Sequence, residues 1–353
     1  MDRHHAITLL VGGRSTEHDA SLHGYQHVLQ QLSEHPGRVI VDAVLYVDRD
    51  GLGHFFDQPP WPADEYDLQK RSAQPLVQAI ARLLERNSFV FSLLHGNEGE
   101  DGGWQGVADV LGVRGSFGPT LASALGMDKY FQAMVVRTLV RDVLLPRTRL
   151  VTTAQFDAAG VLADLGGGPV VVKPNRMGAS LFTRLLGAPD PEALRRAVAQ
   201  VQPYDNQILV QEYVAGQEVS CGIFSDHGAF IDLPVADIIT GDGFFGHDEK
   251  HQKGKATVRL RAEDDITTNV RTYSRTLFSA LSIATFARFD YIVRQDGIYF
   301  LEVNTLPGLM SGSIFPLMLS ARNKTVVDLI ESAVAEYRDR PLRRKVASYD
   351  IHH

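Results

Sequence analysis

Two carboxylates, an amide and a guanidinium occur close together late in the chain, at Asp290, Glu302, Asn304 and Arg288. The apolar runs on either side of Gln295-Asp296-Gly297 are typical of a β-hairpin, because glycine permits the positive φ of a tight turn. A three-residue loop pairs Asp290 with Glu302 and places all four side chains on one face. The same loop pairs Arg288 with Asn304. A two-residue loop would put the two carboxylates on opposite faces.

This hairpin face predicts a magnesium site. Carboxylates that face each other across two strands repel unless a cation lies between them. Hard oxygen ligands suit Mg²⁺, which usually takes one or two carboxylates together with substrate phosphates. The alternative is a surface hairpin with ordinary solvated charges.

Two polar segments follow apolar strands in the N-terminal third of the chain. The strand Ala6–Val11 leads through a glycine turn into a helical pattern, a βα unit whose helix begins at the ligand-facing edge of the sheet. Glu17 lies at the start of this helix, where the dipole favours a carboxylate with or without a ligand. The strand Phe89–Leu94 ends in a glycine-rich segment that begins with His95. We expect His95 to face the loop of Glu17.

A lysine at the end of another strand suggests phosphate binding. Val170–Val172 ends in Lys173 and a loop that runs to Ser180. An ammonium group and backbone N–H groups in such a loop can bind phosphate oxygens. The spacing is not that of a Walker loop, and no dinucleotide glycine fingerprint follows the first strand, which argues against a Rossmann-type dehydrogenase.

Composition excludes several other classes of protein. A chain of 353 residues can form two or three packed units. The net charge of −7 argues against a nucleic-acid-binding protein. No apolar run has membrane-spanning length, and the N-terminus lacks a signal-peptide pattern, so we expect no membrane association. The single cysteine, Cys221, fits a reducing compartment, and we expect a cytoplasmic protein.

Six motifs follow one another along nearly the whole chain, from Ile7 to Ser313. They read VGGRSTEHDASL, LLHGNEGEDGGWQG, SALGMDK, VVVKPNRMGAS, ILVQEYVAGQE and RFDYIVRQDGIYFLEVNTLPG. Together they resemble the D-alanine–D-alanine ligases of the ATP-grasp superfamily. The resemblance implies an α/β fold, with α+β parts, in which a Rossmann-like domain precedes an ATP-grasp fold. The implied parts are an N-terminal substrate domain (1–117), a central ATP-grasp subdomain (118–207), a C-terminal subdomain with the magnesium site (208–345) and a tail (346–353).

The resemblance implies ATP and two Mg²⁺ ions as cofactors, with Mn²⁺ as a substitute. The positions that match nucleotide-binding residues are Lys129, Lys173, Ser180, Gln211, Glu212, Tyr213, Val214, Glu218 and Lys250. Among these, the lysines match phosphate contacts, the run 211–214 matches the adenine-binding hinge, and Glu218 matches the ribose-binding carboxylate. Asp290, Glu302 and Asn304 match the metal ligands, in agreement with the chemistry of the hairpin.

The remaining matches concern the amino-acid substrates. Glu17 matches the carboxylate that pairs with the ammonium group of the first amino acid, and His95 matches a nearby group. Arg288 and the backbone N–H of Gly308 match the donors that stabilise the tetrahedral intermediate. Ser313 matches a contact with the carboxylate of the second substrate. The resemblance therefore implies ATP-dependent joining of two amino acids through an acyl phosphate, by a homodimer, with D-alanyl-D-alanine as the default product.

Two loops depart from the family pattern, in which the lysine is followed by Gly-Ser-Ser-Val-Gly. This chain has Ala179 in place of the first serine and Phe182 in place of the last glycine. A later loop lacks the usual closing tyrosine and contains His247 and His251, either of which matches the histidine of D-alanine–D-lactate ligases. The hydroxyl link over the acceptor site therefore cannot form as usual.

These departures leave alternative functions open. One alternative is a ligase with another acceptor, such as D-lactate, D-serine or a different amino acid, in resistance or specialised metabolism. An alternative from a different class is a non-catalytic amino-acid or nucleotide sensor. The metal-ligand set and both lysines, Lys129 and Lys173, are intact, which argues against the sensor.

Overall fold

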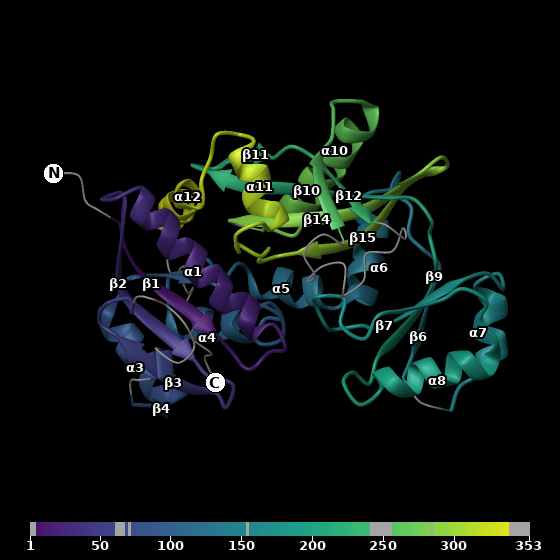
Figure 1. Cartoon of the computed structure of the whole chain (residues 1–353), viewed down its shortest axis with the longest axis horizontal. Helices are drawn as coiled ribbons and strands as arrows, with labels where there is room; N and C mark the ends of the chain where they lie inside the picture. The colour runs from purple at the N-terminus through teal and green to yellow at the C-terminus, as the bar shows by residue number, and fades with distance from the viewer. Residues whose placement is uncertain are drawn as a thin grey trace, which may run out of the picture.

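The computed structural model describes residues 5–60, 68–69, 72–152, 155–240, 256–283 and 285–338. Its strands form three sheets, with helices packed around them (Figure 1). This mixed architecture confirms the predicted α/β class with α+β parts. Among the described residues, no helix has both the length and the apolar character needed to cross a membrane.

The first sheet has the strand order β4-β3-β2-β1-β5. Its strands are β1 (His5–Gly12), β2 (Val39–Val47), β3 (Leu52–Phe56), β4 (Gln74–Pro75) and β5 (Phe89–Ser92), and its helices are α1 (His18–Glu34), α3 (Leu76–Arg86) and α4 (Gly103–Leu111). Strand β1 runs parallel to both β2 and β5. The loops that follow β1 and β5 therefore leave the same edge of the sheet, as expected for a Rossmann-like domain.

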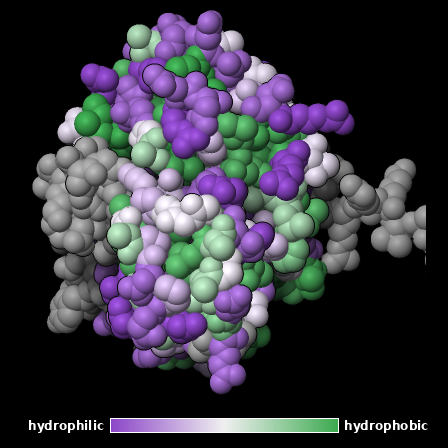
Figure 2. All heavy atoms as spheres, turned by 90° about the vertical axis from the view of Figure 1, so that its right-hand side faces the viewer, coloured by the Kyte–Doolittle hydropathy of each residue, from purple (hydrophilic) through white to green (hydrophobic). Residues whose placement is uncertain are grey.

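A four-stranded antiparallel sheet forms a separate central unit, with the order β6-β9-β7-β8. Its strands are β6 (Thr148–Val151), β7 (Val170–Pro174), β8 (Arg184–Leu186) and β9 (Ile208–Glu212), and its helices are α7 (Ala158–Asp164) and α8 (Pro191–Val201). Helices α5 (Thr120–Met127) and α6 (Lys129–Leu139) connect the first sheet to this unit. On the side of the molecule where this unit lies, hydrophilic and hydrophobic residues are interspersed (Figure 2).

The six-stranded sheet carries the predicted hairpin. Its path is β13-β12-β10-β14-β15, and β11 pairs with β10. The strands are β10 (Gln217–Asp226), β11 (Ala229–Asp232), β12 (Ala236–Thr240), β13 (Ala256–Leu260), β14 (Phe286–Arg294) and β15 (Gly297–Asn304). Helices α10 (Asp265–Ala280), α11 (Ile314–Ser320) and α12 (Val326–Arg338) pack around the sheet.

The domain division expected from the sequence remains a proposal. Strand β9 pairs with β6 and β7 of the central sheet. Sheet membership therefore favours a boundary after Glu212 rather than between residues 207 and 208. The predicted tail, 346–353, lies outside the described residues.

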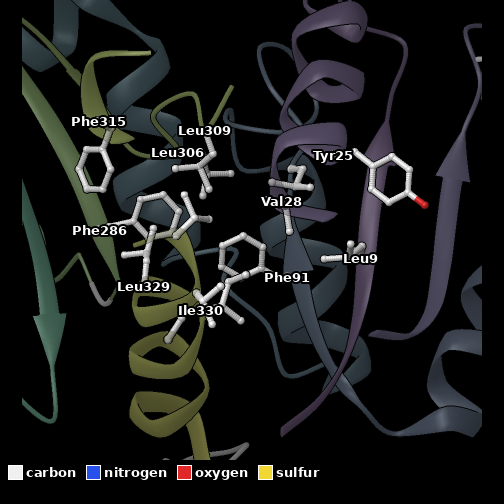
Figure 3. Packing of buried hydrophobic residues seen from close by; sticks show 14 of the residues in the cluster. Leu9, Tyr25, Val28, Phe91, Phe286, Leu306, Leu309, Phe315, Leu329 and Ile330 are labelled. Carbon is white, nitrogen blue, oxygen red and sulfur yellow. The ribbon is translucent and has the colours of Figure 1, made fainter. Parts of the chain in front are cut away.

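One hydrophobic cluster joins the first sheet to the C-terminal elements. Leu9, Val28 and Phe91 from the N-terminal unit belong to the same buried cluster as Phe286 and Ile330 (Figure 3). Helix α12 packs against both β10 and α1. Because this core is shared, the loops at the edge of the first sheet hold a defined position relative to the hairpin.

Candidate active site

The hairpin places the four predicted side chains opposite one another in pairs. Asp290 pairs with Glu302, and Arg288 pairs with Asn304, as predicted. The predicted three-residue loop is wrong, because Arg294 pairs with Gly297 and leaves a two-residue turn. The pairing arises from a β-bulge in β15.

The bulge lies at Leu301. Tyr291 pairs with Phe300 whereas Asp290 pairs with Glu302, so Leu301 is an extra residue in β15. Adjacent residues of a regular strand face opposite sides of the sheet. Here both Leu301 and Glu302 line the same cavity. The bulge therefore produces the pairing of Asp290 with Glu302 that was expected from a three-residue loop.

Three side chains donate hydrogen bonds to the buried carboxylate of Asp290. Ser220 Oγ donates to Oδ1 at 2.6 Å, while Arg288 Nη2 and Asn304 Nδ2 donate to Oδ2 at 2.8 and 2.9 Å. Ser220 lies directly across from Asp290 on β10. Sequence reasoning missed Ser220, because a serine in an apolar strand gives no signal until the strand register is known.

Arg288 keeps its positive charge in this setting. Burial lowers the pKa of a guanidinium, but the negative charges of Asp290, Glu302 and Glu218 raise the pKa of Arg288 above its ordinary value. Arg288 can therefore act as a permanent cationic donor beside the carboxylates.

Lys129 connects the hairpin to the loop after β7. Its Nζ donates to the carbonyl oxygen of Met177 at 2.8 Å and lies 3.5 Å from Glu302 Oε2. Asp128 caps helix α6 by accepting from the N–H of Phe131 at 3.0 Å, which fixes the first turn from which Lys129 projects. The ammonium group thus lies between the hairpin, which is expected to hold Mg²⁺, and the loop after β7, which is expected to bind phosphate.

A cavity of about 900 Å³, including space open to solvent, lies between the central sheet and the hairpin. Residues predicted to bind the nucleotide line it, namely Lys129, Lys173, Ser180, Gln211, Glu212, Tyr213, Val214 and Glu218. Glu302 also lines this cavity. Lys250, His247 and His251 lie outside the described residues, so their predicted roles have no counterpart in this geometry.

Arg147 holds the carboxylate of Glu212 at the edge of the cavity. The backbone N–H and Nε of Arg147 donate to the two oxygens of Glu212 at 2.8 and 2.7 Å. The N–H of Tyr213 is bonded to the carbonyl of Pro169 at 2.9 Å. These bonds fix the backbone of the predicted adenine hinge. Arg147 was not predicted, because it lies far from Glu212 in the sequence.

Glu17 and His95 lie in neighbouring loops at the edge of the first sheet. Glu17 makes no side-chain capping hydrogen bond with helix α1. A Cβ atom at Gly178 would overlap Glu17 Oε1, and one at Gly96 would lie 2.9 Å from it, so glycines allow two loops to approach this carboxylate. Ser15, from the loop of Glu17, donates to the carbonyl of His95 at 2.6 Å. The expected proximity of the two loops is confirmed.

The imidazole of His95 is buried and lies 3.9 Å from Glu100. Burial lowers the pKa of His95, but the nearby carboxylates of Glu100 and Glu17 outweigh this effect and raise it. Within the described part of the chain, Nε2 of His95 has no hydrogen-bond partner. Nε2 of His95 is thus left available for a ligand in the loop next to that of Glu17.

Gly308 and Ser313 lie together at the end of the hairpin. A Cβ atom at Gly308 would lie 3.6 Å from Ser313 Oγ. Leu306 and Leu309 on either side of Gly308 are buried in the shared core, which anchors the backbone of this loop (Figure 3). The N–H of Leu306 also donates to Glu100 at 3.3 Å, which ties the loop to the His95 segment.

Comparison with known proteins identifies the family. A family model for the N-terminus of D-ala D-ala ligases matches residues 6–116, and one for the C-terminus matches residues 149–335. The chain belongs to the D-alanine–D-alanine ligase family. It is therefore an ATP-dependent carboxylate–amine ligase, as the motifs implied.

Relatives in this family extend over nearly the whole chain. A D-alanine–D-alanine ligase of Pediococcus pentosaceus is 28% identical over 353 residues, which covers 93% of this chain and 96% of that protein. A ligase of the same name from Aquifex aeolicus is 28% identical and covers 92% of this chain and 98% of its own length.

Solved structures of such ligases share the fold. The D-alanine–D-alanine ligase of Bacillus anthracis complexed with ATP has a TM-score of 0.70 and 23% identity, covering 95% of this chain and 99% of its own. The VanG D-Ala:D-Ser ligase of Enterococcus faecalis has a TM-score of 0.78 and 23% identity, covering 95% of this chain and 100% of its own. The predicted ATP-grasp fold with a Rossmann-like N-terminal domain is confirmed.

The ligands of the hairpin suit the metal that the family resemblance implies. The described residues hold no cluster of three or more His, Cys, Asp or Glu side chains suited to a metal ion. The predicted set instead has two carboxylates and one amide, at Asp290, Glu302 and Asn304. Mg²⁺ is commonly held by so few carboxylates when phosphates complete its shell. The residues therefore fit Mg²⁺ that binds together with ATP.

Proposed function

We propose that this ligase joins two amino acids through an acyl phosphate, with D-alanine as the first substrate and a D-alanyl-D-alanine-type dipeptide as the product. The observation that carries the proposal is that the nucleotide cavity, the hairpin and the loop of Glu17 lie next to one another. The cavity lined by the predicted nucleotide residues opens onto Glu302 of the hairpin, and Lys129 lies between them. Glu17, at the edge of the first sheet, is contacted by the same loop that borders this cavity.

The proposed chemistry overcomes the unfavourable joining of a carboxylate to an amine in water. A carboxylate oxygen of the first amino acid attacks the terminal phosphorus of ATP, and ADP leaves. The neutral amine of the second amino acid then attacks the carbonyl carbon, the nitrogen loses one proton, and phosphate leaves with one former carboxylate oxygen. No protein nucleophile takes part, which agrees with a sequence that lacks a Ser-His-Asp or Cys-His signature.

The chain's own residues would position and stabilise these groups. Glu17 would pair with the ammonium group of the first amino acid, with His95 beside it. Arg288 and the N–H of Gly308 would donate to the oxygen that becomes negative in the tetrahedral intermediate, where one such donor is typically worth about 3–4 kcal/mol. Ser313 would contact the carboxylate of the second amino acid.

Asp290, Glu302 and Asn304 would hold two Mg²⁺ ions, or Mn²⁺ in their place. When bound, such ions neutralise charge on the transferring phosphoryl group. Lys129 and Lys173 would bind phosphate oxygens, and Ser180 lies in the loop that follows β7, the strand of Lys173. The bulge at Leu301 supports this proposal, since it brings Glu302 onto the same face as Asp290.

A second candidate is a ligase that takes another acceptor, such as D-serine, D-lactate or a different amino acid. The observation in its favour is Ala179, which offers no hydroxyl in the loop beside Glu17. One solved structure with the same fold is a D-Ala:D-Ser ligase, so the fold accommodates acceptors other than D-alanine. The non-catalytic sensor is disfavoured by the intact hairpin.

Product analysis separates these candidates. The enzyme is incubated with ATP, Mg²⁺ and D-alanine, alone or with D-serine, D-lactate or L-amino acids, and the products are identified by mass. D-Alanyl-D-alanine as the sole product supports the first candidate. A mixed dipeptide or depsipeptide supports the second. Nucleotide binding without ADP formation in any mixture would favour a sensor.

The proposal also includes a homodimer and a cytoplasmic location. The family resemblance supports the homodimer. The single cysteine, which is buried, supports the cytoplasmic location. Sedimentation at equilibrium measures the mass of the assembly directly, and a monomer at micromolar concentration would contradict the proposed dimer.

A further inference from the structure

The loop between β7 and β8 has an unusual backbone. Ala179, Ser180 and Phe182 have φ values of 51°, 52° and 56°, in the left-handed region that disfavours residues with a Cβ atom. Glycine would adopt these angles without cost. Contacts with the rest of the structure must therefore hold the loop in this conformation.

This loop lies between two parts of the proposed active site. Ser180 and Thr183 line the nucleotide cavity. Gly178 closely approaches Glu17 Oε1. The position of the loop therefore affects both the nucleotide site and the first amino-acid site.

Two backbone hydrogen bonds within the loop are long. The N–H of Leu181 donates to the carbonyl of Gly178, and that of Thr183 to the carbonyl of Ser180, each at 3.2 Å. Bonds of this length are at the weak end of the normal range. They favour a turn but do not attach it to the body of the central unit.

The aromatic ring of Phe182 provides such an attachment. It stacks on the ring of Tyr204, with centroids 3.8 Å apart and planes inclined by 15°. Phe182 also packs against the hydrophobic cluster of the central unit. Tyr204 follows helix α8, and its N–H donates to the carbonyl of Val201 at 2.9 Å. The stack thus joins the loop to the end of a helix.

We propose that Phe182 and Tyr204 form an aromatic latch that positions loop 178–183 for nucleotide binding. Tyr204 is then a positioning residue that acts through Phe182, since it does not line the cavity. The inference rests on the proposed ATP site. It explains how a bulky residue is accommodated at a position with a left-handed backbone, because the ring makes a contact that glycine lacks.

Replacing Tyr204 tests the latch with little risk to folding, because this side chain is 57% exposed. Tyr204→Ala removes the ring, whereas Tyr204→Phe keeps the stacking surface. The dissociation constant of a non-hydrolysable ATP analogue with Mg²⁺ is measured by calorimetry, alongside KM for ATP and kcat. We expect Tyr204→Ala to weaken analogue binding and raise KM about two- to tenfold, the range expected for one aromatic pair, with a smaller change in kcat. Tyr204→Phe should restore binding.

A double-mutant cycle separates the latch from a general loss of stability. Phe182→Gly removes the other ring and permits the same backbone, so adding Tyr204→Ala to it should have no further effect on binding. Independent effects would overturn the latch, as would equal binding by Tyr204→Ala and the wild type. Failure of the wild type to bind the analogue would instead overturn the proposed ATP site, and the latch with it.

Discussion

At the scale of single residues, the hydrogen bonds to Asp290 illustrate how the site is built. Ser220 of β10, Asn304 of β15 and Arg288 of its own strand donate to its two oxygens. Hydrogen bonds from several sides fix the orientation of a buried carboxylate. The carboxylate proposed to bind a cation is therefore oriented by donors before substrate arrives.

Ser220→Ala tests this arrangement. We expect a loss of about 1.5–3 kcal/mol in the free energy of unfolding, because a hydrogen bond to a charged group is lost in the core. Urea denaturation without nucleotide measures the loss. Ser220→Thr keeps the hydroxyl and should recover most of the stability. Equal stability of Ser220→Ala and the wild type would show that the bond contributes nothing.

At the scale of secondary-structure elements, the first turn of α6 positions Lys129 through its cap. Burial raises the pKa of Asp128, but hydrogen bonds from the N–H of Phe131 and from the side chains of Asn175 and Arg176 outweigh it and lower the pKa. A carboxyl whose pKa is lower in the folded chain stabilises the fold above its unfolded pKa, about 4. This contribution is lost as the pH falls through the folded pKa.

Asp128→Asn retains a capping oxygen but removes the charge. At pH 7 we expect the variant to be less stable by about 1 kcal/mol, the order of a charge-assisted bond over a neutral one. The difference should shrink as the pH falls below about 4, since the wild-type carboxyl then becomes neutral. Denaturation series at several pH values measure it, and a constant difference would contradict the assigned role.

The bulge at Leu301 in β15 has a direct chemical consequence, because it places Glu302 opposite Asp290. The bulge brings two carboxylates together, and Glu302→Gln removes one of them. We expect ligase activity to fall by at least about 10²-fold, the loss typical of removing one transition-state contact. Leu301→Ala changes the neighbouring side chain, leaves the carboxylate in place and serves as the control. A folded Glu302→Gln variant with normal activity would refute the role of this pair.

The hairpin also shows what sequence reasoning could and could not reach. The pairing of Asp290 with Glu302 was predicted from a three-residue loop, and the pairing is confirmed although that loop is wrong. The turn was predicted wrongly, because the bulge depends on partners elsewhere. Gln132 of α6 accepts from the N–H of Val303 at 3.2 Å, and the N–H of Phe300 donates to Leu144. Neither contact can be predicted from the sequence of the hairpin alone, because both partners lie outside it.

Residues that act through distant contacts were missed for the same reason. Ser220, Arg147 and Tyr204 each meet their partner only after separate strands or helices pack together. The motif residues were predicted because they follow strand ends, where glycine and charge mark a ligand-facing edge. The sequence accordingly predicts that the loops of Glu17 and His95 lie near each other, and the hydrogen bond between Ser15 and His95 confirms it.

At the scale of the whole molecule, the shared core determines how the units behave together. Phe286 of β14 is 1% exposed and stacks on Phe91 of β5, with ring centroids 6.3 Å apart. The first sheet and the C-terminal sheet therefore share buried surface. The central unit has its own cluster around Val172 and Val198.

Phe286→Ala should destabilise both units that share this core. We expect a loss of about 3–5 kcal/mol, as is typical when a buried phenylalanine is truncated. Hydrogen exchange measured by mass spectrometry should show protection falling together in β1 and α12, with a smaller change in α8. Loss of protection confined to the C-terminal sheet would show that the two units unfold independently.

Transfer of a labelled oxygen tests the proposed reaction most directly. D-Alanine labelled with ¹⁸O in both carboxylate positions is incubated with the enzyme, ATP and Mg²⁺, and the phosphate and dipeptide are analysed by mass. Ligation through an acyl phosphate predicts one ¹⁸O atom in each phosphate released, with the other retained in the new peptide carbonyl. Unlabelled phosphate, or ADP formed at the same rate without an amino acid, would contradict the proposed function.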